Sequence, residues 1–458
     1  MNLLTTLIFL LNLWRPAFCK EQAFHRAKEH AIAGLCAFGR KTITNFAIFL
    51  GRDQANIIAD YKLYSEYKWH PTDLFNPLLE QGLKYTTGRY MTIAADDTRL
   101  PKSGKKIPNA SWGRDPMSAH FHTNLMWGIR FLQMSLILPL YQREAQSAPR
   151  AIPVRFIDAP SVKKPGKRAS KEEIKAYKEK IKVHNLSTLF VKNAKELRET
   201  LDGLGYQDRI LLYSVDGSFC NKTCFGLEDQ RIHLVARCRK NIKLCFKSQE
   251  GGRRFYAKEK FTPEEVRQDE TIAWQTKTIF YGGERRTIRC KEVNHILWQG
   301  GAKRRNLRLI VIAPLPYIRA GRRNYRYPAY LLCTDTEGDL QELMQSYFDR
   351  LPIEYNHRDE KSIVGVGQAQ VRNEYSVWKQ PALQVAAYSA LLLASVMAYQ
   401  DKHHADFGET PYWRRPPKRN TCRALVGNLR QSLLEEPAKI VELGLTPPII
   451  AAILSKAA

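Results

Sequence analysis

The chain has 458 residues, of which 44% are hydrophobic, so it has room for about two to four domains with sizeable cores and is not a disordered chain. Its 72 Lys and Arg residues exceed its 45 Asp and Glu residues and give a formal net charge of +27. This excess favours a polyanionic partner, either nucleic acid or an anionic membrane. The nine cysteines lack the spacing of a disulfide framework or of a common zinc site and predict reduced thiols in a cytosol.

Residues 1–88 show a helical pattern and are expected to form an α-helical N-terminal domain that binds DNA. The first stretch, MNLLTTLIFLLNLWRPAFC, resembles a secretory signal in its apolar run. It has no Lys or Arg before that run, whereas secretory signals normally begin with a charged region. A buried first helix is therefore the favoured interpretation.

Residues 89–244 read as the first part of an α/β core. RYMTIAADD predicts a strand that stops on Asp96 and Asp97, and LMWGIRFLQMSLILPL predicts neighbouring strands. A basic linker over 160–182 leads into an exposed helix, which is either a solvated face or a DNA contact. A helix closed by Gly205, the strand RILLYSV, the turn DGS and the strand IHLVARC follow. Alternating strands and helices indicate a mixed α/β layer.

Residues 245–328 consist of short β-like pieces with turn signals and predict a β-rich insertion. Two runs in it, residues 303–308 and 319–327, are rich in Arg, and the second interleaves Arg with Tyr, a combination that suits phosphate neutralisation and stacking on bases. We therefore expect DNA contacts from four residues: Arg304, Arg305, Arg322 and Arg323.

Residues 329–400 resume the α/β pattern and form the second part of the core, and residues 401–458 read as a basic tail. The apolar run PALQVAAYSALLLASVMAYQ is near the minimum length for a membrane span. It contains Gln384, Tyr388 and Ser389, which favour a core helix. No secure transmembrane segment is predicted.

The stretch YFDRLPIEYNHRDEK, residues 347–361, has charged and aromatic residues at helical intervals. At about 100° per residue, Tyr347, Arg350, Glu354 and Lys361 fall within an arc of roughly 60° on one helical face. A lone carboxylate beside a Tyr, an Arg and a Lys suits a site that handles phosphate. The alternative is a solvated charged face with Arg350 paired to Glu354.

Other carboxylates stand where predicted strands end, at Asp96 or Asp97 and at Asp216 in the turn DGS. Acids at strand ends project from the edge of an α/β sheet, where ligand sites usually occur. Strand parity sends Asp96 and Asp97 in opposite directions, so only one of them can be a ligand. Asp335, in LLCTDTEGD, competes with Asp216. Together with Glu354, two such acids can hold two Mg²⁺ or Mn²⁺ ions about 4 Å apart for phosphodiester chemistry.

The spacing Tyr347-x2-Arg350-x3-Glu354-x6-Lys361 resembles the YREK signature of bacterial insertion-sequence transposases of the DDE type. The segments AADDTRLPKSGKK and SVDGSFCN resemble the same family, and the likeness covers roughly residues 89–400. Leu351 stands where the family often has an aromatic residue after the signature Arg.

The resemblance implies an RNase H-like catalytic core, interrupted by the β-rich insertion and preceded by the helical domain. It implies Asp96, Asp216 and Glu354 as catalytic metal ligands. It also implies that Tyr347, Arg350 and Lys361 contact phosphates near the cleaved end. An insertion-domain Trp stacks on a flipped base in related enzymes, and here Trp298 takes that place, although a Trp more often packs in a core.

The function implied is a DNA transposase, an endonuclease and strand transferase that cuts each transposon end in a metal-dependent reaction. The freed 3′-hydroxyl then attacks target DNA. The expected partners are double-stranded DNA, as terminal inverted repeats and as target, and a second copy of the chain in a synaptic homodimer, with no membrane. The expected location is the nucleoid in a bacterial cytoplasm. The alternatives are an inactive or domesticated DNA-binding protein and an RNase H-like nuclease without strand transfer.

Overall fold

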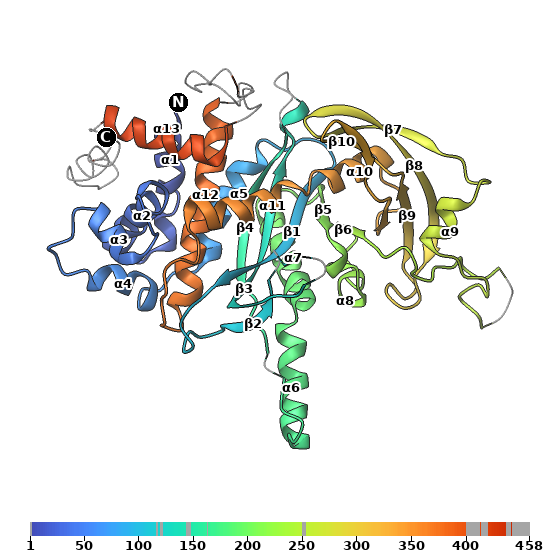
Figure 1. The fold of residues 1–458 in the computed structure, drawn as a ribbon, viewed down its shortest axis with the longest axis horizontal. Coiled ribbons are helices and arrows are strands. Elements are labelled where there is room, and N and C mark those ends of the chain that lie inside the picture. The colour runs from blue at the N-terminus through green and yellow to red at the C-terminus, as the bar shows by residue number, and fades with distance from the viewer. Residues whose placement is uncertain are drawn as a thin grey trace. The chain divides into compact units, whose positions relative to one another are not determined.

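The computed structural model describes residues 2–115, 118–119, 122–142, 148–162, 164–249, 253–399, 413, 420–436 and 441 (Figure 1). The chain divides into two compact units. The first unit comprises residues 1–86, 97–185 and 352–458, and the second comprises residues 87–96 and 186–351. The sequence predicted five consecutive segments with other boundaries, and that division into domains stays a prediction.

The first unit contains most of the helices. Those of the N-terminal segment are α1 (Leu3–Asn12), α2 (Glu21–Cys36), α3 (Ile43–Phe49), α4 (Ile58–Ser65) and α5 (Pro71–Leu83). The remaining helices are α6 (Lys171–His184), α11 (Pro352–Asp359), α12 (Ser376–Tyr399) and α13 (Cys422–Glu435). Side-chain caps at Asn2 and Thr42 satisfy backbone N–H groups where α1 and α3 begin. The predicted helical N-terminus with a buried first helix is confirmed.

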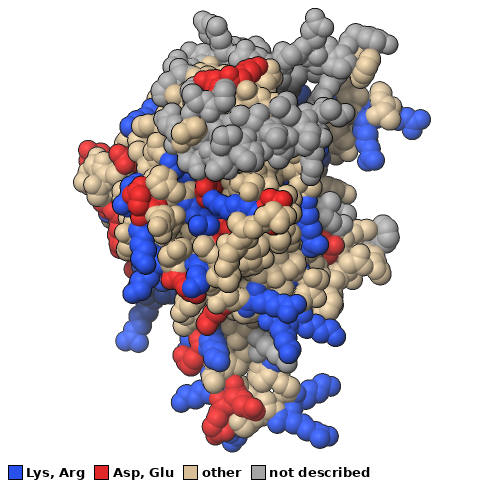
Figure 2. Space-filling model, turned by 90° about the vertical axis from the view of Figure 1, so that its left-hand side faces the viewer, with Lys and Arg blue, Asp and Glu red and all other residues tan. Residues whose placement is uncertain are grey.

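Helix α12 is the apolar centre of the first unit and packs against α1, α2, α5 and strand β4 (Arg150–Asp158). It is long and apolar enough to cross a membrane, but 83% of its most apolar window is buried inside the unit. Helix α13, with Leu425, Leu429 and Leu433 buried, lies in the segment that the sequence predicted as a tail. Helix α6 has no buried residue, and Lys and Arg mix with Asp and Glu at the foot of Figure 2, where it projects.

The strands of the first unit are β2 (Ser111–Arg114), β3 (Leu125–Leu138), β4 and the later part of β1 (Tyr90–Pro101). Strand β3 pairs antiparallel with β2 and with β4, and β1 lies next to β3. Phe131 and Phe156 stack across β3 and β4 with ring centroids 4.4 Å apart. The predicted end of the first strand at Asp96 and Asp97 is wrong, because β1 continues to Pro101 alongside β3.

The second unit is built on a mixed sheet with the order β1-β5-β6-β12-β9-β8-β7. Strands β1, β5 and β6 are parallel, and the strands that follow them in the sheet are antiparallel to their neighbours. The strands are β5 (Ile210–Val215), β6 (Ile232–Arg237), β7 (Gln275–Tyr281), β8 (Glu284–Leu297), β9 (Asn306–Ile312), β10 (Pro316–Arg319), β11 (Arg322–Tyr325) and β12 (Ala329–Cys333). The helices are α7 (Leu186–Gly203), α8 (Lys222–Phe225), α9 (Pro263–Gln268) and α10 (Leu340–Phe348). The mixed α/β class predicted from the sequence is confirmed.

Helices cover both faces of the sheet in the second unit, which explains the continuous apolar run of β5. Leu212 belongs to a buried cluster with Leu343 and Met344 of α10. The next residue, Tyr213, points to the other face and meets Phe190 of α7 edge-on at 5.1 Å. The alternation along β5 therefore assigns each residue to the α10 face or to the α7 face.

A buried ionic network ties α2 to α4 in the first unit. The carboxylate of Asp60, whose side chain is 0% exposed, accepts hydrogen bonds of 2.8 Å from Arg26 and Arg52 and lies 2.8 Å from Nε2 of His30. Burial alone would raise the pKa of Asp60, but the bond to His30 and the charges of His30, Arg26 and Arg52 lower it from 3.8 to about 2. The charged form of Asp60 is therefore favoured by the fold.

We expect this network to add stability that is present above about pH 4 and is lost as the pH falls through about 2, because the folded pKa of Asp60 lies below the unfolded one. The loss is about 2 kcal/mol of unfolding free energy. Urea unfolding at a series of pH values measures it. Asp60→Asn should remove this acid-dependent step, and the exposed Asp53→Asn should keep it. Identical pH profiles for wild type and Asp60→Asn would contradict this assignment.

Candidate active site

Asp96 and Asp216 lie side by side in the sheet of the second unit. Strands β1 and β5 are paired in parallel from Tyr90 with Ile210 to Ala95 with Val215, and the two aspartates are the next residue on each strand. Residues level on neighbouring parallel strands project to the same face, about 4.8 Å apart in backbone position. Both aspartates are half-buried, and parity places them on the α10 face. The register therefore brings these two predicted carboxylates together.

The choice between Asp96 and Asp97 follows from their partners. Asp97 points to the opposite face of β1, where its Oδ2 lies 2.7 Å from Nε of Arg130 on β3. Asp96 Oδ2 lies 3.6 Å from Nη1 of Arg350, which follows α10. Asp96 is thus the acid that shares a face with Asp216 and with a predicted phosphate-binding cation.

Asp216 is held in place by the turn that it begins. Its Oδ1 accepts hydrogen bonds from the Ser218 N–H at 2.9 Å and from Ser218 Oγ at 2.6 Å, which caps the short 3₁₀ turn Gly217–Phe219. The turn residues DGS thus fix the carboxylate, and both of these bonds engage the same oxygen. Oδ2 keeps its capacity to bind a ligand.

Arg237 lies level with Asp216 on the next strand of the sheet, β6. Val215 pairs with Ala236 in the parallel β5–β6 ladder, so Asp216 and Arg237 are the following pair and share a face. Asp96, Asp216 and Arg237 thus lie in one row across three neighbouring strands. The sequence interpretation missed Arg237, although the basic run RCRK at the end of a predicted strand was a signal for it.

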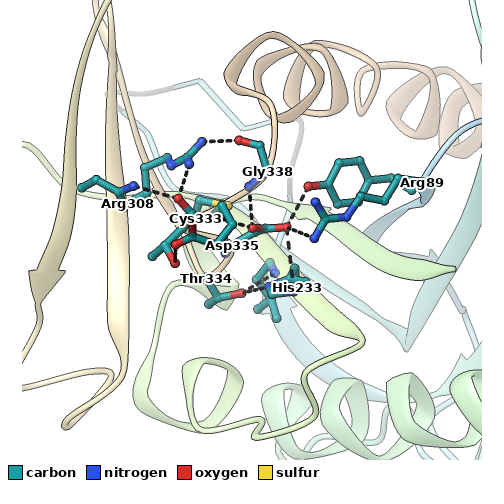
Figure 3. Close-up of polar contacts among 12 residues, drawn as sticks. Arg89, His233, Arg308, Cys333, Thr334, Asp335 and Gly338 are labelled. Carbon is teal, nitrogen blue, oxygen red and sulfur yellow. Dashed lines mark hydrogen bonds and ion pairs between the residues drawn. The ribbon is translucent and has the colours of Figure 1, made fainter. Parts of the chain in front are cut away.

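Asp335, the acid that competes with Asp216, lies at the other end of the strands of the same sheet. Strand β12 runs antiparallel to β6, so the residues after β12 lie where β1, β5 and β6 begin. Asp335 is 2% exposed and accepts hydrogen bonds from the Tyr90 hydroxyl at 2.7 Å and from the Gly338 N–H at 2.8 Å. Arg89 and His233 add ion-pair contacts at 4.0 and 3.8 Å (Figure 3). The burial of Asp335 and its several partners favour a structural role over metal binding.

The stretch from Tyr347 to Lys361 is not one helix, so the prediction that its four signature residues share a helical face is wrong. Helix α10 ends at Phe348, and α11 begins at Pro352, which lacks the N–H needed to continue a helix. Tyr347, half-buried against the core, and Arg350 belong to the second unit. Glu354, exposed in the first turn of α11, and Lys361, in a π-helical turn over Glu360–Val364, belong to the first unit.

Trp298 borders an open pocket of about 1070 Å³ in the second unit, next to the Asp216 turn. Gly217 and Ser218 line one part of this pocket, and Arg237, Arg239, Lys240 and Tyr327 line others. The Trp298 ring meets Phe225 edge-on at 5.6 Å and lies over Gly301, where an added Cβ would fall 2.2 Å from the ring. Gly301 thus lets the ring take this position. The pocket combines cations with aromatic rings beside a predicted catalytic acid.

The four arginines predicted to contact DNA differ in their surroundings. Arg304 is exposed, with its guanidinium 4.9 Å from the Phe255 ring centroid. Arg305 is half-buried and donates a hydrogen bond to the Leu227 carbonyl, and burial lowers its pKa. Arg322 and Arg323 are exposed on β11.

The carboxylate pair has the ligand chemistry of the predicted metal ions. Asp96 and Asp216 offer oxygen ligands on one face, which suits Mg²⁺ or Mn²⁺ because these ions bind one or two carboxylates beside waters and substrate phosphates. Over the part of the chain that the structure describes, no three His, Cys, Asp or Glu side chains gather into a complete site. All nine cysteines are free thiols.

Comparison of the sequence with protein-family models and with curated proteins finds no match to this chain.

Proposed function

We propose that the protein is a DNA transposase of the DDE type with an RNase H-like core. The observation that carries the proposal is the register that sets Asp96 and Asp216 on one face of adjacent parallel strands. The strand connections support it. Strand β1 joins β5 in parallel and β5 joins β6 in parallel, so the two acids lie on neighbouring strands of a mixed α/β sheet.

Asp96, Asp216 and Glu354 would together hold the two divalent ions. When bound, the ions activate the attacking oxygen and neutralise charge on the leaving oxygen. In the first step water attacks phosphorus at the transposon end and the bond to the 3′-oxygen breaks. In the second step the freed 3′-hydroxyl attacks a target phosphodiester, whose own 3′-oxygen leaves.

The cations around the acids fit a phosphate substrate. Arg350 lies beside Asp96, and Arg237 occupies the position level with Asp216 on the same face, so two arginines neighbour the carboxylate pair. Arg binds phosphate oxygens in a bidentate manner and keeps its charge at all relevant pH values. Tyr347 and Lys361 complete the phosphate contacts, and Trp298 stacks on a base in the pocket beside Asp216.

The proposed partners are duplex DNA and a second copy of the chain, because two transposon ends must be joined. A net charge of +27 supports DNA as the partner, since phosphate neutralisation dominates the affinity of such proteins. The proposed location is the bacterial nucleoid. The runner-up functions are a nuclease that cuts without joining and a DNA-binding protein without catalysis.

Incubation of the purified full chain and Mg²⁺ with labelled duplexes that carry the element's own ends tests the proposal. Those ends come from the DNA that flanks the coding region. A transposase nicks the ends and produces joined strands, whereas the nuclease alternative yields nicks without joints. Binding without either product would favour the DNA-binding alternative.

A further inference from the structure

Strands β10 and β11 form a two-stranded ribbon that is a separate sheet in the second unit. They pair antiparallel from Pro316 with Tyr325 to Arg319 with Arg322. The two turn residues, Ala320 and Gly321, both have positive φ angles, of 49° and 74°. A two-residue loop with two positive φ angles matches the twist of a hairpin. The ribbon is therefore a defined hairpin with a tight tip.

The ribbon carries positive charge that no carboxylate balances. No Asp or Glu occurs between residues 293 and 334, while Arg319, Arg322, Arg323 and Arg326 all lie in or beside the ribbon. Arg319 and Arg322 stand directly opposite one another, and like charges in such pairs are destabilising. Within the described residues no ion pair reaches Arg319, Arg322 or Arg323. A polyanion would remove this repulsion.

The base of the ribbon is fixed to the unit. The Arg326 N–H donates to the Leu315 carbonyl at 2.9 Å. The Arg326 guanidinium lies 5.7 Å from the Tyr317 ring centroid and 5.9 Å from that of Tyr281 on β7. These contacts brace the hairpin where it leaves the sheet.

One apolar side chain stands out on this charged ribbon. Ile318 is 79% exposed and pairs with Arg323, and the exposed Tyr325 shares their face. The opposite face carries Arg319 and Arg322. An isoleucine is stiff because it is branched at Cβ. A stiff apolar group between arginines matches the side chains that enter the minor groove and wedge between base steps.

We propose that the β10–β11 ribbon enters the minor groove of duplex DNA and that Ile318 inserts between base pairs and bends the duplex. The arginines of the ribbon neutralise the phosphates on both sides of the groove. The inference rests on the proposed function for its partner, duplex DNA, but bending requires neither the acids nor a metal. It adds a DNA-deforming element to a protein proposed to cut and join DNA.

Energy transfer between dyes at the two ends of a duplex of about 30 base pairs measures the bend. The Asp216→Asn chain without Mg²⁺ serves as the parent, so that no DNA is cut. Ile318→Ala should remove most of the bend and change the affinity by less than about tenfold, because the phosphate contacts remain. Ile48→Ala, at an isoleucine that is 52% exposed on α3, should bend DNA like the parent.

The charged side chains are tested separately. A double variant, Arg319→Ala with Arg322→Ala, should weaken binding and reduce the slope of log K against log salt by about 2. Arg285→Ala, at an exposed arginine two residues after Gly283 in the β7–β8 turn, should leave that slope unchanged. A drug that occupies the minor groove should compete with the ribbon.

If the Ile318→Ala protein bends DNA as strongly as its parent, Ile318 does not insert between base pairs. If methyl groups in the major groove weakened binding and the minor-groove drug did not, the placement of the ribbon in the minor groove would be wrong. If the wild type bends DNA through Ile318 but never cuts it, the proposed transposase function fails while the ribbon inference stands. If the wild type cuts and joins but Ile318→Ala changes no bend, the ribbon inference fails alone.

Discussion

Asp96→Asn should reduce Mg²⁺-dependent cleavage by about 10³-fold or more, whereas Asp97→Asn should cut at nearly the wild-type rate. The two residues are neighbours, but only Asp96 is level with Asp216 and faces Arg350. An amide keeps the size of the side chain and removes the charge that holds a divalent ion. Loss of that ion removes several kcal/mol of transition-state stabilisation, and each 1.36 kcal/mol corresponds to a factor of ten.

Single-turnover cleavage of an end-labelled duplex, beside a binding titration in Ca²⁺, measures this difference. Asp97→Asn is the matched control because Asp97 lies on the other face of β1, where it pairs with Arg130, and a partly exposed ion pair is worth less than about 1 kcal/mol. Asp96→Asn should still bind DNA. If the rates of the two variants were reversed, Asp97 would be the metal ligand and the register argument would be wrong.

Asp335→Asn should lower the free energy of unfolding by about 3–5 kcal/mol, because it removes a buried charge and leaves its partners unpaired. Burial by itself would raise the pKa of Asp335, yet the Tyr90 hydrogen bond, His233 and the N–H groups of Glu337 and Gly338 lower it. Stability from this group is therefore present above the usual carboxyl pKa and falls as the solution is acidified. The pKa of Tyr90 rises because the ring is buried and bonded to Asp335.

Guanidinium unfolding at neutral pH measures the effect. Tyr90→Phe is the matched control, since it removes one hydrogen bond to a charged acceptor and should cost about 1.5–3 kcal/mol. The fraction of Asp335→Asn that stays folded should cleave DNA normally. A variant as stable as the wild type that cannot cut DNA would make Asp335 the second catalytic acid.

Local pattern identified the strands of the second unit because their apolar runs end at clear turn signals. RILLYSV and IHLVARC correspond to β5 and β6, and the turn DGS is the 3₁₀ turn that holds Asp216. The first strand was predicted too short, because its later residues are polar. Arg99 and Lys102 are nevertheless buried, because they donate hydrogen bonds to the carbonyls of Gly128 and Gly367, which are distant in the chain. A sequence pattern does not reveal such partners.

The stretch from Tyr347 to Lys361 shows the other limit of a periodicity argument. A helical wheel assumes one uninterrupted helix, but Pro352 starts a new one, and the wheel then misplaces every residue beyond the break. Arg350 also pairs with Asp96, more than 250 positions away in the chain, and a helical wheel cannot report such a partner. Arg237 was missed for a related reason, since only the β5–β6 register places it beside Asp216.

The most direct test compares wild type with Asp216→Asn in Mg²⁺ on duplexes that carry the element's ends, with cleavage, joining and binding measured on the same samples. The expected result is nicked and joined DNA from the wild type, and binding without either product from Asp216→Asn. Equal cutting by the two proteins would show that Asp216 serves only its turn and would contradict the proposed pair of catalytic carboxylates.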